Sequence, residues 1–159
     1  MIDPSFIEIA LANKGIVLPA APKVVANYIP CKQAGNLLYI SGQLPFQDGK
    51  ILHPGIVGDS VSFEQAVEAA QQCALNILTI LYDHIQNDWS KVVGCVRLGG
   101  FVAATSNYID HPKIINGASD FIAEILGEAG KHARAAVGVA SLPLGACVEV
   151  EAIFELIPA

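Results

Sequence analysis

The sequence predicts an α+β protein in which two long helices pack on one face of a sheet. Two segments carry apolar residues at helical spacing, and the other apolar runs are of strand length and lie next to turn residues. The predicted order is a helix, strands, a helix, a strand, a helix and two strands, which favours this class. The 159 residues suit a single domain spanning 1–159.

The first predicted element is a helix at the N-terminus, in addition to the two long ones. Asp3 precedes Pro4, and Ser5 lies three residues before Glu8, the spacing of a capping box. Gly15 supplies the signal that ends this helix.

Strands are expected next, at residues 23–29 and 36–44, with a turn near Gly35 between them. The sequence QDGK at 47–50 is typical of a hairpin turn, and a short strand is predicted at 50–52.

The clearest helix covers residues 63–85, where the apolar residues share one helical face and Ser62 is placed to be the N-cap. A strand predicted at 91–104 is apolar on both faces apart from Arg97. No further long helix remains to cover the second face of the sheet, and only 15% of the residues are charged. Another subunit is the simplest cover, so we expect an oligomer.

Residues 111–130 contain two conflicting signals. Asn116 and Gly117 form a hairpin dipeptide, but the apolar residues keep a helical period through them, so we predict a helix with an interior glycine. Residues 131–156 then have the pattern of a β-hairpin.

Charge and cysteine usage exclude several classes of function. The net charge is −6 with a pI near 5.0, and no basic run exists, which argues against binding to nucleic acid. The start MIDPSF lacks the features of a signal peptide, and no stretch is long and apolar enough to span a membrane, so we expect a soluble, cytoplasmic protein. The four cysteines are far apart, which predicts reduced, buried thiols and no metal site.

Arg134 is the most informative residue of the predicted C-terminal hairpin, because a guanidinium keeps its charge and needs an anionic or hydrogen-bonding partner when buried. One interpretation is an internal salt bridge with Glu149 or Glu151. The other is an anchor for a substrate carboxylate at the edge of a pocket. The residues alone leave both open.

Four other residues could take part in chemistry. Strict alternation places Glu149 and Glu151 on one face of the last strand, where each could be a solvated charge or an acid and base beside a pocket. Tyr28 could belong to the core or present its hydroxyl to a ligand. Gly42, in the sequence Ser41-Gly42-Gln43, would let a ligand approach the backbone closely.

Several stretches together resemble the YjgF/RidA family of reactive-intermediate deaminases. They are YISGQLPFQDG (39–49), CALNILTIL (73–81) and the segment 116–156, and the resemblance spans residues 21–156. It implies a chorismate-mutase-like fold, a homotrimer with pockets at the subunit clefts, and hydrolysis of 2-imino acids and their enamine tautomers to 2-keto acids and ammonia. No cofactor is implied, because an iminium carbon is already electrophilic.

The resemblance also implies catalytic roles for individual residues. Arg134 matches the arginine that holds the substrate carboxylate, and Glu149 matches the glutamate that positions or activates the attacking water. Tyr28 matches a tyrosine that lines the cleft.

Substrate-binding roles are implied as well. Gly42 matches a glycine whose backbone borders the pocket, and Asn116 matches a helix asparagine. Ala136 stands where the family usually has cysteine and would contribute its backbone carbonyl, and His132 stands where the family usually has proline. Two alternatives to the deaminase are an endoribonuclease, as some members of this family are called, and a non-enzymatic binder of small carboxylates.

Overall fold

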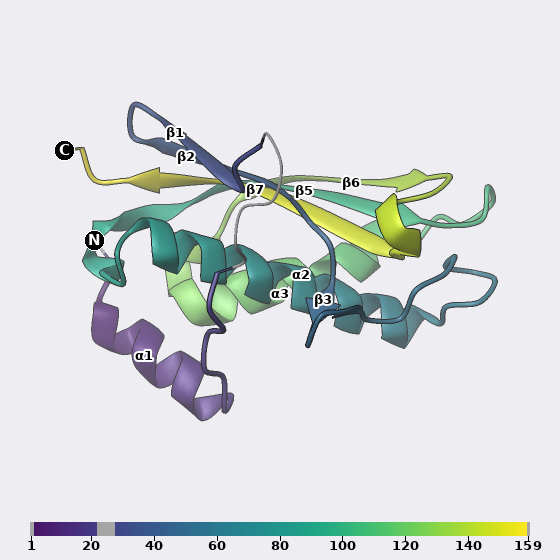
Figure 1. Ribbon diagram of the computed structural model, residues 1–159, viewed down its shortest axis with the longest axis horizontal. Coiled ribbons are helices and arrows are strands. Elements are labelled where there is room, and N and C mark those ends of the chain that lie inside the picture. The colour runs from purple at the N-terminus through teal and green to yellow at the C-terminus, as the bar shows by residue number, and fades with distance from the viewer. Residues whose placement is uncertain (1, 22–27, 159) are drawn as a thin grey trace.

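The computed structural model describes residues 2–21 and 28–158. A five-stranded sheet in the order β1-β2-β7-β5-β6 carries two long helices on one face (Figure 1). A separate two-stranded ribbon, β3-β4, packs against α2. The elements are α1 (Pro4–Asn13), β1 (Cys31–Ala34), β2 (Leu37–Gln43), β3 (Phe46–Gln47), β4 (Lys50–Ile51), α2 (Phe63–His84), β5 (Val92–Ala103), α3 (His111–Leu126), β6 (Ala133–Val139) and β7 (Val148–Leu156).

The two C-terminal strands do not form the predicted hairpin. β6 pairs in parallel with β5, after a crossover through α3, and lies at the edge of the sheet. β7 instead runs antiparallel to both β2 and β5 and lies between them. The pattern of residues 131–156 defines two strands correctly, but period-two alternation fixes only the faces of a strand and not its neighbours. β7 gains a hydrogen-bonded partner on each side by this insertion.

The alternation in β7 is confirmed. Its buried residues, which face the helices, are Val148, Val150, Ala152, Phe154 and Leu156. The residues between them, including Glu149 and Glu151, are half-buried on the other face. A single-residue shift of register would therefore place these glutamates in the core.

The two long helices lie side by side against the sheet (Figure 1). Ser62 caps α2 as predicted, in a capping box with Gln65. The helix predicted through Gly117 is also confirmed, because α3 continues through it. A Cβ at Gly117 would overlap the carbonyl oxygen of Val67 in α2, so the glycine allows the two helices to approach closely.

The N-terminal helix α1 begins where the sequence predicts, but its cap differs in detail. The side chain of Asp3 accepts a hydrogen bond from the backbone N–H of Ser5, and Pro4 occupies the first turn. Ile7 and Leu11 are buried, and the helix packs against α3. The acceptor at this helix start is therefore Asp3 rather than Ser5.

The first predicted strand, at residues 23–29, lies largely outside the described residues. Tyr28 and Ile29 have no regular secondary structure, and β1 begins at Cys31. The turn at Gly35 and the hairpin turn between β3 and β4 are both present as predicted.

The sheet face opposite the helices has no helical cover within the described ranges (Figure 1). Tyr39 and Val137 are exposed on it, and Phe101 is half-buried. The apolar pattern of the strand predicted at 91–104 had indicated such a face, with no helix to cover it.

Three of the four cysteines are buried, as the sequence predicts. All four are free thiols; Cys73, Cys95 and Cys147 are buried and Cys31 is half-buried. Burial raises the pKa of Cys95 to about 12 and that of Cys147 to about 11, so both thiols stay protonated near neutral pH. Among the described residues there is no cluster of metal-ligating side chains, and no helix is long and apolar enough to cross a membrane.

Candidate active site

Arg134 lies on the edge strand β6, with its side chain over α3. It is opposite Leu98 in the parallel register, and it is exposed at the rim of the helix-covered face. Its Nη1 atom donates hydrogen bonds to Asn116 Oδ1 at 2.8 Å and to Ser119 Oγ at 3.1 Å, both on α3. The structure therefore brings Arg134 and Asn116 together, as the resemblance implies.

The internal salt bridge between Arg134 and either glutamate is not formed. β5 lies between β6 and β7, and the glutamates point to the opposite face of the sheet from Arg134. Arg97, on β5, forms the ion pair with Glu151 instead: its Nη1 atom lies 3.0 Å from Glu151 Oε1. This reading of Arg134 was wrong because it assumed that β6 and β7 are neighbours.

Glu149 and Gly42 form a second group, on the uncovered face. A Cβ at position 42 would overlap the carboxylate of Glu149, so the absence of a side chain makes room for that carboxylate. The pairing of β2 with β7 is irregular between Ile40 and Gln43, which shifts the backbone at Gly42. Gly42 thus lies beside the predicted acid and base.

The carboxyl of Glu149 has an altered affinity for protons. Partial burial raises its pKa above the ordinary range, and the negative charge of Glu151 raises it further. A carboxyl with a raised pKa is better suited to accept and return a proton near neutral pH than a fully solvated one.

The remaining predicted residues differ in where they lie. Ala136 follows Arg134 by two residues on the same face of β6, pairs with Gly100 and packs against the core. Tyr28 is exposed just before β1, and its hydroxyl has no hydrogen bond to the other candidate residues within the described part of the chain. One chain therefore carries two separate groups, Arg134 with Asn116 and Ala136, and Glu149 with Gly42.

Two residues near Arg134 were not predicted as site residues. Ser119 Oγ lies 2.9 Å from His132 Nε2, and His132 Nδ1 lies 2.6 Å from the carbonyl oxygen of Gly130. Ser119 could have been found, because it lies three residues after Asn116 and so shares its helical face. His132 carries no such signal, since its contact depends on the turn between α3 and β6.

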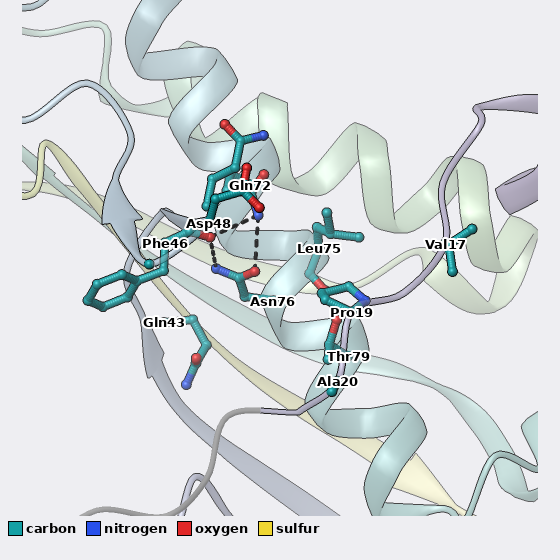
Figure 2. A pocket seen from close by; sticks show the side chains of 12 residues that line it. Val17, Pro19, Ala20, Gln43, Phe46, Asp48, Gln72, Leu75, Asn76 and Thr79 are labelled. Carbon is teal, nitrogen blue, oxygen red and sulfur yellow. Dashed lines mark hydrogen bonds between the residues drawn. The ribbon is translucent and has the colours of Figure 1, made fainter.

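A cavity of about 590 Å³ lies elsewhere, between α2, the β3-β4 ribbon and residues 17–20 (Figure 2). Two of its amide side chains already have partners: Asn76 donates to the carbonyls of Leu44 and Phe46, and Gln72 donates to the carbonyl of Phe46. These bonds attach the ribbon to α2, so they have a structural role.

Comparisons with known proteins identify the family and the fold. Residues 8–156 match the family model described as "YjgF/chorismate_mutase-like, putative endoribonuclease". Protein TCP17 of Trypanosoma cruzi is 40% identical over 92% of this chain and 91% of its own length. A crystal structure of Atu1372 from Agrobacterium tumefaciens, described as of unknown function, is 47% identical, covers 96% of this chain and 94% of its own, and superposes with a TM-score of 0.90.

A more distant relative has a named activity. The 2-iminobutanoate/2-iminopropanoate deaminase of Dermatophagoides farinae is 28% identical over 87% of this chain and 92% of its own length. The family model covers nearly the whole chain, and the helices and sheet have the arrangement that the resemblance implies. The chain therefore belongs to the YjgF/RidA family, with its chorismate-mutase-like α+β fold.

Proposed function

We propose that this protein is a hydrolytic deaminase that converts 2-imino acids and their enamine tautomers to 2-keto acids and ammonia. The observation that carries the proposal is Arg134, whose guanidinium is held by Asn116 and Ser119 and yet remains exposed to a ligand. A planar guanidinium matches a carboxylate in two-point contact. The named activity of the Dermatophagoides farinae relative supports the same chemistry.

The complete site is proposed to form between subunits of a homotrimer. Arg134 and Glu149 point to opposite faces of one sheet, so one chain cannot apply both to a small substrate. In the proposed assembly, Arg134, Asn116 and Ala136 of one subunit face Gly42, Glu149 and Tyr28 of the next. The uncovered sheet face and the exposed edge strand β6 supply surfaces for this contact.

The proposed reaction needs only binding, orientation and proton transfer. Arg134 holds the substrate carboxylate, and Glu149 accepts a proton as the water oxygen attacks C2 of the iminium group. The electron pair of the C=N bond moves to nitrogen, which then receives the proton from Glu149. The C–N bond then breaks with its electron pair leaving on ammonia, while a lone pair of the carbinol oxygen forms the C=O bond. Glu149, ionised again, takes the remaining hydroxyl proton and passes it to the ammonia, so the iminium ion and water become a 2-keto acid and an ammonium ion.

A trapping assay tests the proposal. An amino acid oxidase generates the imine, semicarbazide traps it, and a deaminase competes with the trap. We expect formation of the semicarbazone to fall as the protein is added, and to recover with Arg134→Ala. An initial rate of semicarbazone formation that does not depend on the protein, together with binding of a keto acid at Arg134, would instead favour the non-enzymatic carboxylate binder.

Ribonuclease activity is the alternative that the family description raises. The net charge of −6 opposes it, because affinity for a phosphate backbone comes from clustered lysine and arginine. We expect no measurable binding to single-stranded RNA at physiological salt. Cleavage by homogeneous protein that is lost in Arg134→Ala would contradict this expectation.

A further inference from the structure

Arg134 belongs to a chain of hydrogen bonds that ends at a backbone carbonyl. The carbonyl of Gly130 can only accept, so His132 Nδ1, 2.6 Å away, carries a proton and donates. In the neutral imidazole, Nε2 is then an acceptor, and the hydroxyl of Ser119, 2.9 Å away, donates to it. The direction of each bond follows from the one before it.

Because the Ser119 hydroxyl donates to His132, it can only accept a hydrogen bond from Arg134. With its only hydrogen directed to His132, the hydroxyl presents lone pairs, and one of them accepts from Arg134 Nη1 at 3.1 Å. Asn116 Oδ1 accepts the second hydrogen of Nη1 at 2.8 Å. Both hydrogens of this nitrogen are therefore engaged.

Packing holds the Gly130 end of these hydrogen bonds in place. Gly130 is buried against α3, and a Cβ there would lie 2.6 Å from the carbonyl oxygen of Ile122. The backbone that presents the Gly130 carbonyl to His132 therefore has little room to move. Ser119 and His132 are themselves half-buried, so their bond is partly shielded from water.

We propose that Ser119 and His132 are positioning residues that lock the guanidinium of Arg134 and leave one edge of it for the ligand. A carboxylate can take two parallel N–H groups either from Nη1 and Nη2 or from Nε and Nη2. The first pair would require breaking a bond from Nη1, whereas Nε and Nη2 have no partner within the described part of the chain. The ligand carboxylate therefore binds the Nε–Nη2 edge. The identity of this ligand rests on the proposed function, and the locking of Arg134 does not.

The locking can be measured without any enzyme activity. The chain has only two arginines, so isotopically labelled arginine gives two guanidinium signals, which Arg134→Lys assigns. We expect slow rotation about the Cζ–Nη1 bond of Arg134 in the parent, and fast rotation in Ser119→Ala and His132→Phe. Arg97, which is paired with Glu151, should be unchanged in all of them. Imidazole ¹⁵N shifts should show His132 protonated at Nδ1.

Binding of pyruvate and of its neutral amide then tests the free edge. Ser119→Ala and His132→Phe should weaken pyruvate roughly tenfold, the scale of one charge-assisted hydrogen bond, and leave the amide unaffected. Ser119→Thr, which keeps the hydroxyl, should bind like the parent. His53→Phe is the matched control, because His53 makes a comparable bond to Glu68 on α2, away from this site.

The possible outcomes separate the two proposals. Equal rotation rates in the parent, Ser119→Ala and His132→Phe, with all three folded, would overturn the positioning role, as would a proton on Nε2 of neutral His132. Equal weakening of pyruvate and the amide would overturn the assignment of the edge. Slow rotation in a parent that binds neither pyruvate nor imine would support the locking and reject the proposed function.

Discussion

At the scale of single residues, the proposed role of Arg134 depends on the planar shape of its guanidinium. Arg134→Lys should fail almost as badly as Arg134→Ala, because an ammonium cannot supply a planar two-point contact. Losing this bond should lower kcat/KM for imine hydrolysis about 30- to 1000-fold. Thermal unfolding measured beside the trapping assay is the control. A variant that melts far below the parent but whose folded fraction keeps the parental rate would make Arg134 a structural residue.

Glu149 predicts a specific dependence of the rate on pH. Its carboxylate must be ionised to accept a proton from water, and burial and Glu151 raise its pKa. The rate should therefore fall with decreasing pH through a value above the ordinary carboxyl pKa of about 4.3. Glu151→Gln removes the like charge, so this acid limb should move to lower pH. An arginine beside Glu149 would lower the pKa of Glu149 in both proteins. The pKa of Glu149 would therefore still be lower in Glu151→Gln than in the parent.

The same raised pKa has a consequence for stability. A carboxyl whose pKa is higher in the folded than in the unfolded chain stabilises the fold when protonated. That contribution is present below the unfolded pKa and is lost as the pH rises through the folded one. Glu149→Gln has no carboxyl to titrate at this position. Its free energy of unfolding should therefore vary less with pH than that of the parent over the range in which Glu149 titrates. An identical pH dependence in the two proteins would contradict the raised pKa.

At the scale of elements, substitution of Gly117 should lower stability, whereas substitution of Gly42 should lower turnover. Gly117→Ala would force a Cβ against the backbone of α2, which cannot yield without moving the helix, and should cost about 1–3 kcal/mol of stability. Gly42→Ala would meet the flexible carboxylate of Glu149, so the unfolding free energy should change by less than about 1 kcal/mol. Turnover should instead fall, because Glu149 is displaced. Denaturant unfolding and the trapping assay distinguish the two, and a Gly42→Ala variant with parental turnover would contradict the proposed role of Glu149.

The elements also show what sequence reasoning could and could not predict. Helices α2 and α3 and the buried face of β7 follow from local signals: periodicity, the Ser62 cap and strict alternation. The partners of β6 and β7 did not follow, because strand pairing is decided by contacts far apart in the sequence and by the crossover through α3. In the site, Arg134, Glu149 and Gly42 were candidates from the residues alone, and the family resemblance added Asn116 and the role of each residue. His132 was missed because a turn, not a periodic element, brings it to Ser119.

At the scale of the whole molecule, the proposed function requires that Arg134 and Glu149 serve the same substrate from different subunits. The two side chains lie on opposite faces of one sheet, so the proposed site requires two subunits. Sedimentation at micromolar concentration should show a trimer, and a stable monomer would remove the shared site.

Mixed trimers test this claim most directly. Arg134→Ala and Glu149→Gln chains should each be nearly inactive, so the two are unfolded together in equal amounts and refolded. Random assortment pairs an intact Arg134 with an intact Glu149 at about a quarter of the interfaces, so we predict about a quarter of the parental deaminase rate. A mixture that refolds to trimers containing both chains but is no more active than its separate components would contradict the shared site.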